Sequence, residues 1–282
     1  MKNQSINKSR GRWVPIALFA MMLAMALILW SCAQAKGDAL LPTGFQPPVM
    51  AAAQYVKKPI RGDLGGVLVE IPSHMAEYLE YDGDPGWKGG ENNHAPRTSE
   101  SKIRTFGVDV LYPEMMGKSS IELRKNFSSR IYEATNWIYI VVVSGEGYSG
   151  DGSINKLATA SLARKLDPDG EFFWNRYEKL SQKQFGLEVY VPNGVDPKTG
   201  TSYRNGEHAK DIFVARNLNG EAVSYISCNH EEAALARCTH RFNMAPYMSA
   251  HLAVHYRRGL LSEWSFIQDR VYDLFAGFAV KS

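Results

Sequence analysis

Two cysteine–histidine pairs carry the most suggestive chemistry of this sequence. Cys228 and His230 form one C-x-H unit, and Cys238 and His240 form a second unit ten residues later. Thiolates and imidazoles are ligands of structural zinc, but zinc-binding pairs are usually separated by two to four residues. The alternative is a disulfide between Cys228 and Cys238, which would close a short loop in an oxidising compartment. The spacing favours the disulfide, and His230 and His240 then become ordinary hairpin residues.

Other residues are of the kinds found in a calcium, serine-nucleophile or zinc-protease site, but they do not match the sequence motif of that site. The acidic segments 82–84 and 167–171 lack the later bidentate glutamate of a calcium loop, which predicts plain turns. In the glycine-rich segment 145–153, Asp151 stands where the serine-nucleophile motif G-x-S-x-G requires its last glycine. The histidines do not have the H-E-x-x-H spacing. We therefore expect no catalysis, no cofactor and no metal, and an uncharacterised hydrolase remains the alternative.

Two segments rich in glycine, proline and asparagine predict long exposed loops, at residues 82–102 and 193–209. Exposed loops on a rigid scaffold commonly make protein contacts, and Trp, Tyr and Arg are enriched among the residues that dominate binding energy. We expect a protein partner to contact side chains of both loops. The candidates are Trp87, Lys88, Asn93, His94 and Arg97 in the first loop, and Tyr203 and Arg204 in the second.

The N-terminus carries an export signal. Residues 13–30 form an 18-residue run without a charge, preceded by a basic flank. Such a run is about long enough to cross the inner membrane as a helix, with the basic flank in the cytoplasm. Three interpretations stay open for residues 1–35: an uncleaved anchor, a signal peptide cleaved after Ala33-Gln34-Ala35, and a lipoprotein signal with Cys32 as the lipidated residue. All three place the rest of the chain in the periplasm.

The net positive charge of the chain comes from that N-terminus. The chain has 32 Lys and Arg against 29 Asp and Glu, a net charge of +3, and four of the cations lie in the first twelve residues. From residue 36 onward, 28 cations face 29 acids. The remainder therefore lacks the basic excess of a nucleic-acid-binding protein. Its 45% hydrophobic residues are typical of a folded globular chain.

The elements behind these residues predict an α+β fold with two similar lobes, each an antiparallel sheet with a packed helix. Residues 36–60, with four prolines, predict a tether. Residues 61–183 form the expected N-terminal lobe and residues 184–282 the C-terminal lobe. Apolar and alternating runs predict strands at 66–71, 75–81, 105–112, 137–143, 185–192, 211–216, 221–228, 238–244 and 250–257. Helical spacing predicts helices at 154–166, 171–183 and 264–278, the last capped by Ser262.

An internal match supports two lobes. Segment 185–192, FGLEVYVP, repeats segment 106–113, FGVDVLYP, at an offset of 79 residues. Both copies begin with Phe-Gly and end with proline around an alternating strand pattern. This favours a duplication, although strands draw on few residue types and the match could arise by chance.

Residues 106–120, FGVDVLYPEMMGKSS, and the segment from Tyr225 to the C-terminus carry a family resemblance. They resemble exported, membrane-tethered bacterial immunity proteins encoded beside type VI secretion phospholipase or lipase effectors. The likeness spans about residues 61–280. It implies a non-enzymatic periplasmic protein that binds an incoming lipase toxin and blocks its active site, with no fixed contact residues to transfer. The alternative is an envelope structural or assembly protein that binds partners of its own cell.

Overall fold

The computed structural model describes residues 58–85, 96–130, 135–163, 176–206, 208–230 and 236–281. They belong to one compact unit, Val56–Ser282. The described strands are β1 (Ile60–Leu64), β2 (Val67–Ile71), β3 (Glu77–Tyr81), β4 (Ile103–Leu111), β5 (Trp137–Val143), β6 (Tyr177–Lys179), β7 (Glu188–Pro192), β8 (Lys210–Arg216), β9 (Ala222–Asn229), β10 (Arg237–Asn243) and β11 (His251–Arg257). The described helices are α2 (Ile121–Ser129), α3 (Ser153–Leu162) and α4 (Trp264–Ala276), with 3-10 turns at Ser73–Met75, Gly145–Gly147, Tyr203–Asn205 and Arg258–Glu263.

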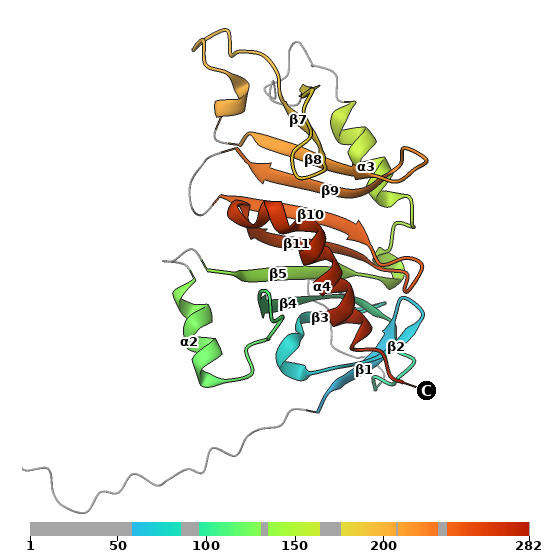
Figure 1. Ribbon diagram of the computed structural model, residues 1–282. Coiled ribbons are helices and arrows are strands. Elements are labelled where there is room, and N and C mark those ends of the chain that lie inside the picture. The colour runs from blue at the N-terminus through green and yellow to red at the C-terminus, as the bar shows by residue number, and fades with distance from the viewer. Residues whose placement is uncertain are drawn as a thin grey trace, which may run out of the picture. The chain divides into compact units, whose positions relative to one another are not determined.

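A nine-stranded sheet organises the unit (Figure 1), in the order β3-β4-β5-β11-β10-β9-β8-β7-β6. Every neighbouring pair is antiparallel. The expected α+β class, with antiparallel strands and packed helices, is confirmed. The sheet is continuous across both halves of the sequence, since β5 pairs with β11 and β6 pairs with β7. The expected lobe boundary at residues 183 and 184 thus lies between two strands that are hydrogen-bonded to each other.

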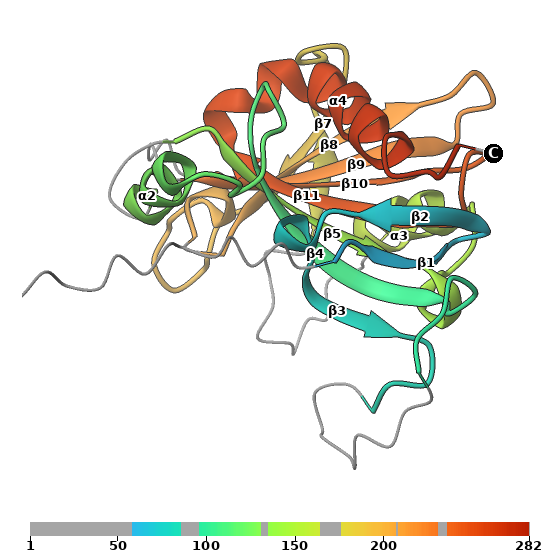
Figure 2. The ribbon, with the colours of Figure 1, turned by 90° about the horizontal axis from the view of Figure 1, so that it is seen from below.

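Helix α4 lies across one face of the sheet (Figure 2). Its residues Ile267, Val271 and Phe275 are fully buried, and the Phe275 ring lies 6.0 Å from the Phe106 ring of β4. The helical stripe expected from the sequence is confirmed at these positions. The helix begins one residue later than a Ser262 cap would place it, because Ser262 belongs to the preceding 3-10 turn and Glu263 occupies the N-cap position.

Helix α3 packs on the opposite face, against the far half of the sheet. Its residues Ile154 and Ala158 form a second apolar cluster with Ile212 and Val214 of β8. The helix expected at residues 154–166 is confirmed as far as Leu162. The helix expected at 171–183 is wrong in its described part, because residues Tyr177–Lys179 form the edge strand β6 and pair with β7.

Helix α2 is not foreseen by the sequence analysis. It is short and has no buried residue, so its sequence has no apolar stripe from which a helix could be predicted. The Ser120 hydroxyl accepts a hydrogen bond from the Leu123 backbone N–H at 3.1 Å, which caps the first turn.

The two copies of the FGxxVxxP match lie in different surroundings. Phe106 is in the middle of β4 and is 1% exposed, whereas Phe185 is 53% exposed. Phe185 and Gly186 both have positive φ, 52° and 82°, and form the turn that precedes β7. The Phe-Gly pairs are therefore not equivalent, although Val110 and Val189, the shared valine of the two copies, are both buried. The duplication stays a prediction.

A small hairpin completes the unit beside the end of the chain. β1 and β2 pair through a turn at Gly65 and Gly66, which both have positive φ. The segment after α4 lies along β2: the Glu70 N–H donates to Phe278 O at 2.8 Å and the Val280 N–H donates to Leu68 O at 2.9 Å. Helix α4 is thus held by the hairpin at its C-terminal end.

No helix within the described ranges is long and apolar enough to span a membrane. The apolar run 13–30, Cys32 and tether residues 36–57 lie outside those ranges.

Candidate functional site

The central strands present a second face, on the side away from α4. Because side chains alternate along a strand, the residues between the buried ones of β4, β5, β11 and β10 point to this side. These residues are Thr105, Gly107, Asp109, Tyr139, Val141, Val143, His251, Ala253, His255, Thr239 and Arg241. We call them the Tyr139–Arg241 face. Most of its side chains are partly buried and retain some exposure to solvent.

Aromatic and imidazole rings lie flat at the centre of this face. The Tyr139 ring stacks on the His255 ring at a centroid distance of 5.9 Å, and His255 Nδ1 lies 3.2 Å from the Thr239 hydroxyl. Gly107 is required beside them, because a Cβ at that position would collide with the Tyr139 ring. Tyr139 therefore covers a strand position that has no side chain, which is a common use of glycine within a sheet.

Acidic side chains border the face on the β3–β4 side. Asp109 Oδ2 lies 2.9 Å from Lys118 Nζ, and Lys118 also forms an ion pair with Glu77. Burial raises the pKa of Asp109 despite the adjacent Lys118. The Phe127 ring of α2 meets the Trp137 ring edge to face at 5.0 Å and closes this border.

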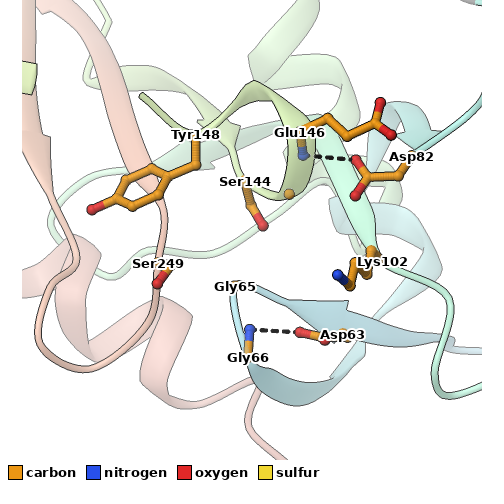
Figure 3. A pocket seen from close by; sticks show the side chains of 10 residues that line it. Asp63, Gly65, Gly66, Asp82, Lys102, Ser144, Glu146, Tyr148 and Ser249 are labelled. Atoms are coloured by element: carbon orange, nitrogen blue, oxygen red, sulfur yellow. Dashed lines mark hydrogen bonds between the residues drawn. The ribbon is translucent and has the colours of Figure 1, made fainter. Parts of the chain in front are cut away.

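A polar pocket lies at another border (Figure 3), where Tyr148 stacks on His251 at 6.0 Å. The pocket has a volume of about 470 Å³. Asp82 accepts a hydrogen bond from the Glu146 N–H at 3.0 Å and Asp63 accepts one from the Gly66 N–H at 2.6 Å. Both carboxylates thereby stabilise backbone turns. Tyr148 lines this pocket and contacts the Tyr139–Arg241 face through His251.

The disulfide between Cys228 and Cys238 is present, as expected. It joins directly opposed residues of β9 and β10, and both cysteines are fully buried. Oxidation removes the thiolates that the zinc alternative needs. Across the described ranges, no cluster of three His, Cys, Asp or Glu side chains is placed to hold a metal ion.

The two histidines beside the disulfide are not ordinary hairpin residues. His240 is fully buried among the rings of Phe242, Tyr256 and Trp264. Burial lowers its pKa to about 3, so the ring is neutral at pH 7. His230 Nδ1 lies 3.2 Å from Asp211 Oδ2. The expectation of two ordinary hairpin residues is therefore corrected: His240 is a core residue and His230 contacts a buried carboxylate.

Asp211 anchors the second predicted loop. This fully buried carboxylate accepts two hydrogen bonds from Arg204, at 2.9 and 3.0 Å, and one from Arg258 at 2.7 Å. Burial alone would raise the pKa of Asp211, but the hydrogen bonds from Arg204, Arg258 and His230 outweigh it and hold the pKa below its usual value. Arg204 thus has a structural role, and about a third of its side chain stays exposed beside the loop.

The other predicted contact residues are placed only in part. Trp87, Lys88, Asn93 and His94 lie outside the described ranges. Arg97 forms an ion pair with Asp84 and lies over the Tyr81 ring at 4.6 Å. Tyr203 begins a 3-10 turn and lies beside Gly194.

The sheet order separates the two predicted loops. Loop 82–102 joins β3 to β4 and loop 193–209 joins β7 to β8, with β5, β11, β10 and β9 between them. From β4 to β8 there are five strand spacings, which is roughly 24 Å. The loops therefore do not form one contiguous patch, and the Tyr139–Arg241 face is carried by strands between them.

The sequence analysis did not select Tyr139 or Arg241. The run 137–143 is apolar at almost every position, so it predicts a strand buried on both faces. The alternation of His251 and His255 with buried Leu252 and Val254 was the available signal for a polar face. It could not show which strands would lie beside β11.

No protein-family model and no curated protein sequence matches this chain. Two solved structures have a similar fold at low sequence identity. One is Smlt3025, an immunity protein of the Stenotrophomonas maltophilia type IV secretion system, with 16% identity, a TM-score of 0.48, and coverage of 79% of this chain and 94% of that one. The other is the Neisseria meningitidis iron-regulated outer membrane lipoprotein FrpD, with 10% identity, a TM-score of 0.42, and coverage of 79% and 93%.

Proposed function

We propose that this chain is a periplasmic immunity protein that binds and neutralises a lipase-type toxin delivered by a type VI secretion system. It acts without catalysis, by occupying the mouth of the toxin's active site. The proposal draws its toxin class from the resemblance of residues 106–120 and 225–282 to such immunity proteins. Two features support the periplasmic location. One is the predicted export signal, and the other is the buried disulfide, because disulfides persist outside the reducing cytoplasm.

The Tyr139–Arg241 face is the observation that supports a binding role most directly. Helix α4 covers one side of the sheet, whereas β5 and β11 keep partly exposed Tyr, His and Ala side chains on the other. Protein interfaces are enriched in Tyr and Arg and need a surface that is already rigid. A central sheet with a cross-strand disulfide provides such a surface. Loops 82–102 and 193–209 then contribute Trp87, Lys88, Asn93, His94, Arg97, Tyr203 and Arg204 as additional contacts.

The test is binding to the toxin encoded beside this gene. The full chain, purified from the cell envelope, should form a complex with that toxin and suppress its lipase activity in proportion to occupancy. Deletion of the gene should leave cells sensitive to attack by their siblings. If the full chain instead co-purifies with envelope-assembly proteins of its own cell, and deletion leaves cells resistant, the envelope-assembly alternative replaces this proposal.

The loop contribution is tested separately. Trp87→Ala should weaken toxin binding by about 30-fold, the loss typical of a tryptophan that dominates a contact. Tyr203→Ala provides the same test for the second loop. Wild-type affinity in both variants would assign the contact to the Tyr139–Arg241 face alone.

A further inference from the structure

Arg241 lies at the β10 end of the Tyr139–Arg241 face. It lies in β10, directly opposite Ala253 of β11 on one side and Tyr225 of β9 on the other. In the same row, beyond Ala253, come Val141 of β5 and Gly107 of β4. Ala253, the immediate neighbour of Arg241 in this row, has a small side chain, and the Tyr139 ring lies over Gly107 at the far end of the row.

Within the described ranges, no acidic side chain pairs with Arg241. Its side chain is partly buried, and it makes no ion pair or side-chain hydrogen bond with any residue of the described ranges. Burial lowers its pKa, which means that the charged form is poorly solvated. Two other arginines of the sheet are paired with acids, Arg104 with Glu80 and Arg216 with Glu188. A desolvated charge without a partner is costly for the free protein.

The acids of this face do not offset that charge. Asp109 lies on β4, three strands away from β10, which is roughly 14 Å at the usual strand spacing. It is already engaged by Lys118. Among the described residues, the positive charge of Arg241 is therefore uncompensated.

Two histidines of β11 flank the position. His251 and His255 lie on either side of Ala253, and burial together with the Arg241 charge lowers the pKa of both. They are consequently neutral near pH 7. His251 Nδ1 is buried and has no hydrogen-bond partner in the described part of the chain. A neutral imidazole and a guanidinium together offer hydrogen bonds to one anionic group.

We propose that Arg241, with His251 and His255, is a carboxylate-binding subsite that receives an Asp or Glu side chain of the toxin. This rests on the proposed function for the identity of the partner. Arg241 binds the carboxylate through its planar guanidinium, and the rings of Tyr139 and Tyr148 pack beside the incoming segment. The partner segment is acidic because charge complementarity at Arg241 requires it.

The first test uses a hexaglutamate peptide and needs no toxin. The peptide should raise the thermal midpoint of the full chain and should not raise that of Arg241→Met. Arg124→Met, which removes an exposed arginine of α2, is the matched control and should respond like wild type. Equal responses of Arg241→Met and wild type to the peptide would overturn the subsite.

The second test uses the toxin. Arg241→Met should weaken toxin binding by about 10- to 100-fold, the range expected for a hydrogen-bonded charge pair, while Arg124→Met binds normally. Arg241→Met should unfold at the same temperature as wild type or higher, because it removes an unpaired charge. A lower unfolding temperature with unchanged toxin affinity would show that Arg241 has only a structural role.

The two tests distinguish an error in the proposed function from an error in the subsite. If the peptide response depends on Arg241 but the chain does not bind the toxin, the proposed function is wrong and the subsite stands. If the toxin binds tightly to wild type and to Arg241→Met alike, and the peptide response is also unchanged, the function stands and the subsite is wrong.

Discussion

At the scale of single residues, chemistry-bearing side chains of this chain have structural roles that their sequence spacing does not reveal. His240 was expected to be an ordinary hairpin residue, yet it is enclosed by Phe242, Tyr256 and Trp264. Arg204 was expected to face a partner, yet it holds the buried carboxylate of Asp211. Only the Cys228–Cys238 pairing followed from spacing, because a two-strand hairpin brings residues ten apart into direct opposition.

His240 should make the stability of the protein depend on pH. Its pKa is about 3 in the folded chain and 6.5 when it is unperturbed. Below pH 6.5 the unfolded chain therefore binds a proton that the folded chain excludes, so the free energy of unfolding falls as pH falls from 6.5 toward 3. The contribution is about 1.4 kcal/mol per pH unit.

The variant His240→Phe isolates this effect, since phenylalanine fits an aromatic environment and does not titrate. Urea unfolding at pH 6, 5 and 4 should show a shallower pH dependence for the variant than for wild type, by about one proton. Parallel curves for the two proteins would mean that His240 is protonated in the folded state. His251 and His255 are unchanged in both proteins, so their contribution cancels in the comparison.

At the scale of elements, strands were easier to foresee than helices. The alternation of apolar residues located β2, β4, β5, β8, β9, β10 and β11 to within about two residues at each end. Helix α4 was found because its apolar stripe is long. Helix α2 was missed because it buries no residue, and the strand β6 was taken for a helix because three residues carry too little periodicity.

Helix α4 offers a matched pair of phenylalanines for testing what holds it on the sheet. Phe275 is fully buried and contacts Phe106 and Phe278, whereas Phe266 is 49% exposed on the same helix. Phe275→Ala should lower the free energy of unfolding by about 3–5 kcal/mol, because a buried cavity replaces the ring. Phe266→Ala should cost about 1 kcal/mol or less. Similar losses in chemical denaturation would show that α4 is not anchored through Phe275.

At the scale of the whole molecule, the sequence predicted the class but not the arrangement of strands. Local patterns specify individual strands, while the contact between β5 and β11 joins segments more than a hundred residues apart. That contact brings Tyr139 and His255 together and creates the candidate binding face. Its existence depends on sheet order, which periodicity does not encode. This is why the sequence pointed to the loops and missed the sheet between them.

The predicted export signal and the observed disulfide together make one prediction about the protein in cells. In cells that produce the full chain, Cys228 and Cys238 should resist a thiol-reactive maleimide until a reductant is added. A variant lacking residues 2–35 should stay in the cytoplasm, where both thiols remain reduced and become labelled in denaturant. It should lose about 2–3 kcal/mol of stability relative to the oxidised form, by the loop-closure estimate for a ten-residue separation.

A further variant separates the effect of losing the disulfide from the effect of changing the compartment. The double variant Cys228→Ala and Cys238→Ala with an intact N-terminus reaches the periplasm without the disulfide, so it is the matched control. We expect it to protect cells against the toxin, at a lower unfolding temperature, because the contact face lies on β5, β11 and β10 rather than on the cysteines. The variant lacking residues 2–35 should fail to protect, because toxin and inhibitor then occupy different compartments. Protection by that cytoplasmic variant equal to wild type would place the toxin's target inside the cell and contradict the periplasmic assignment.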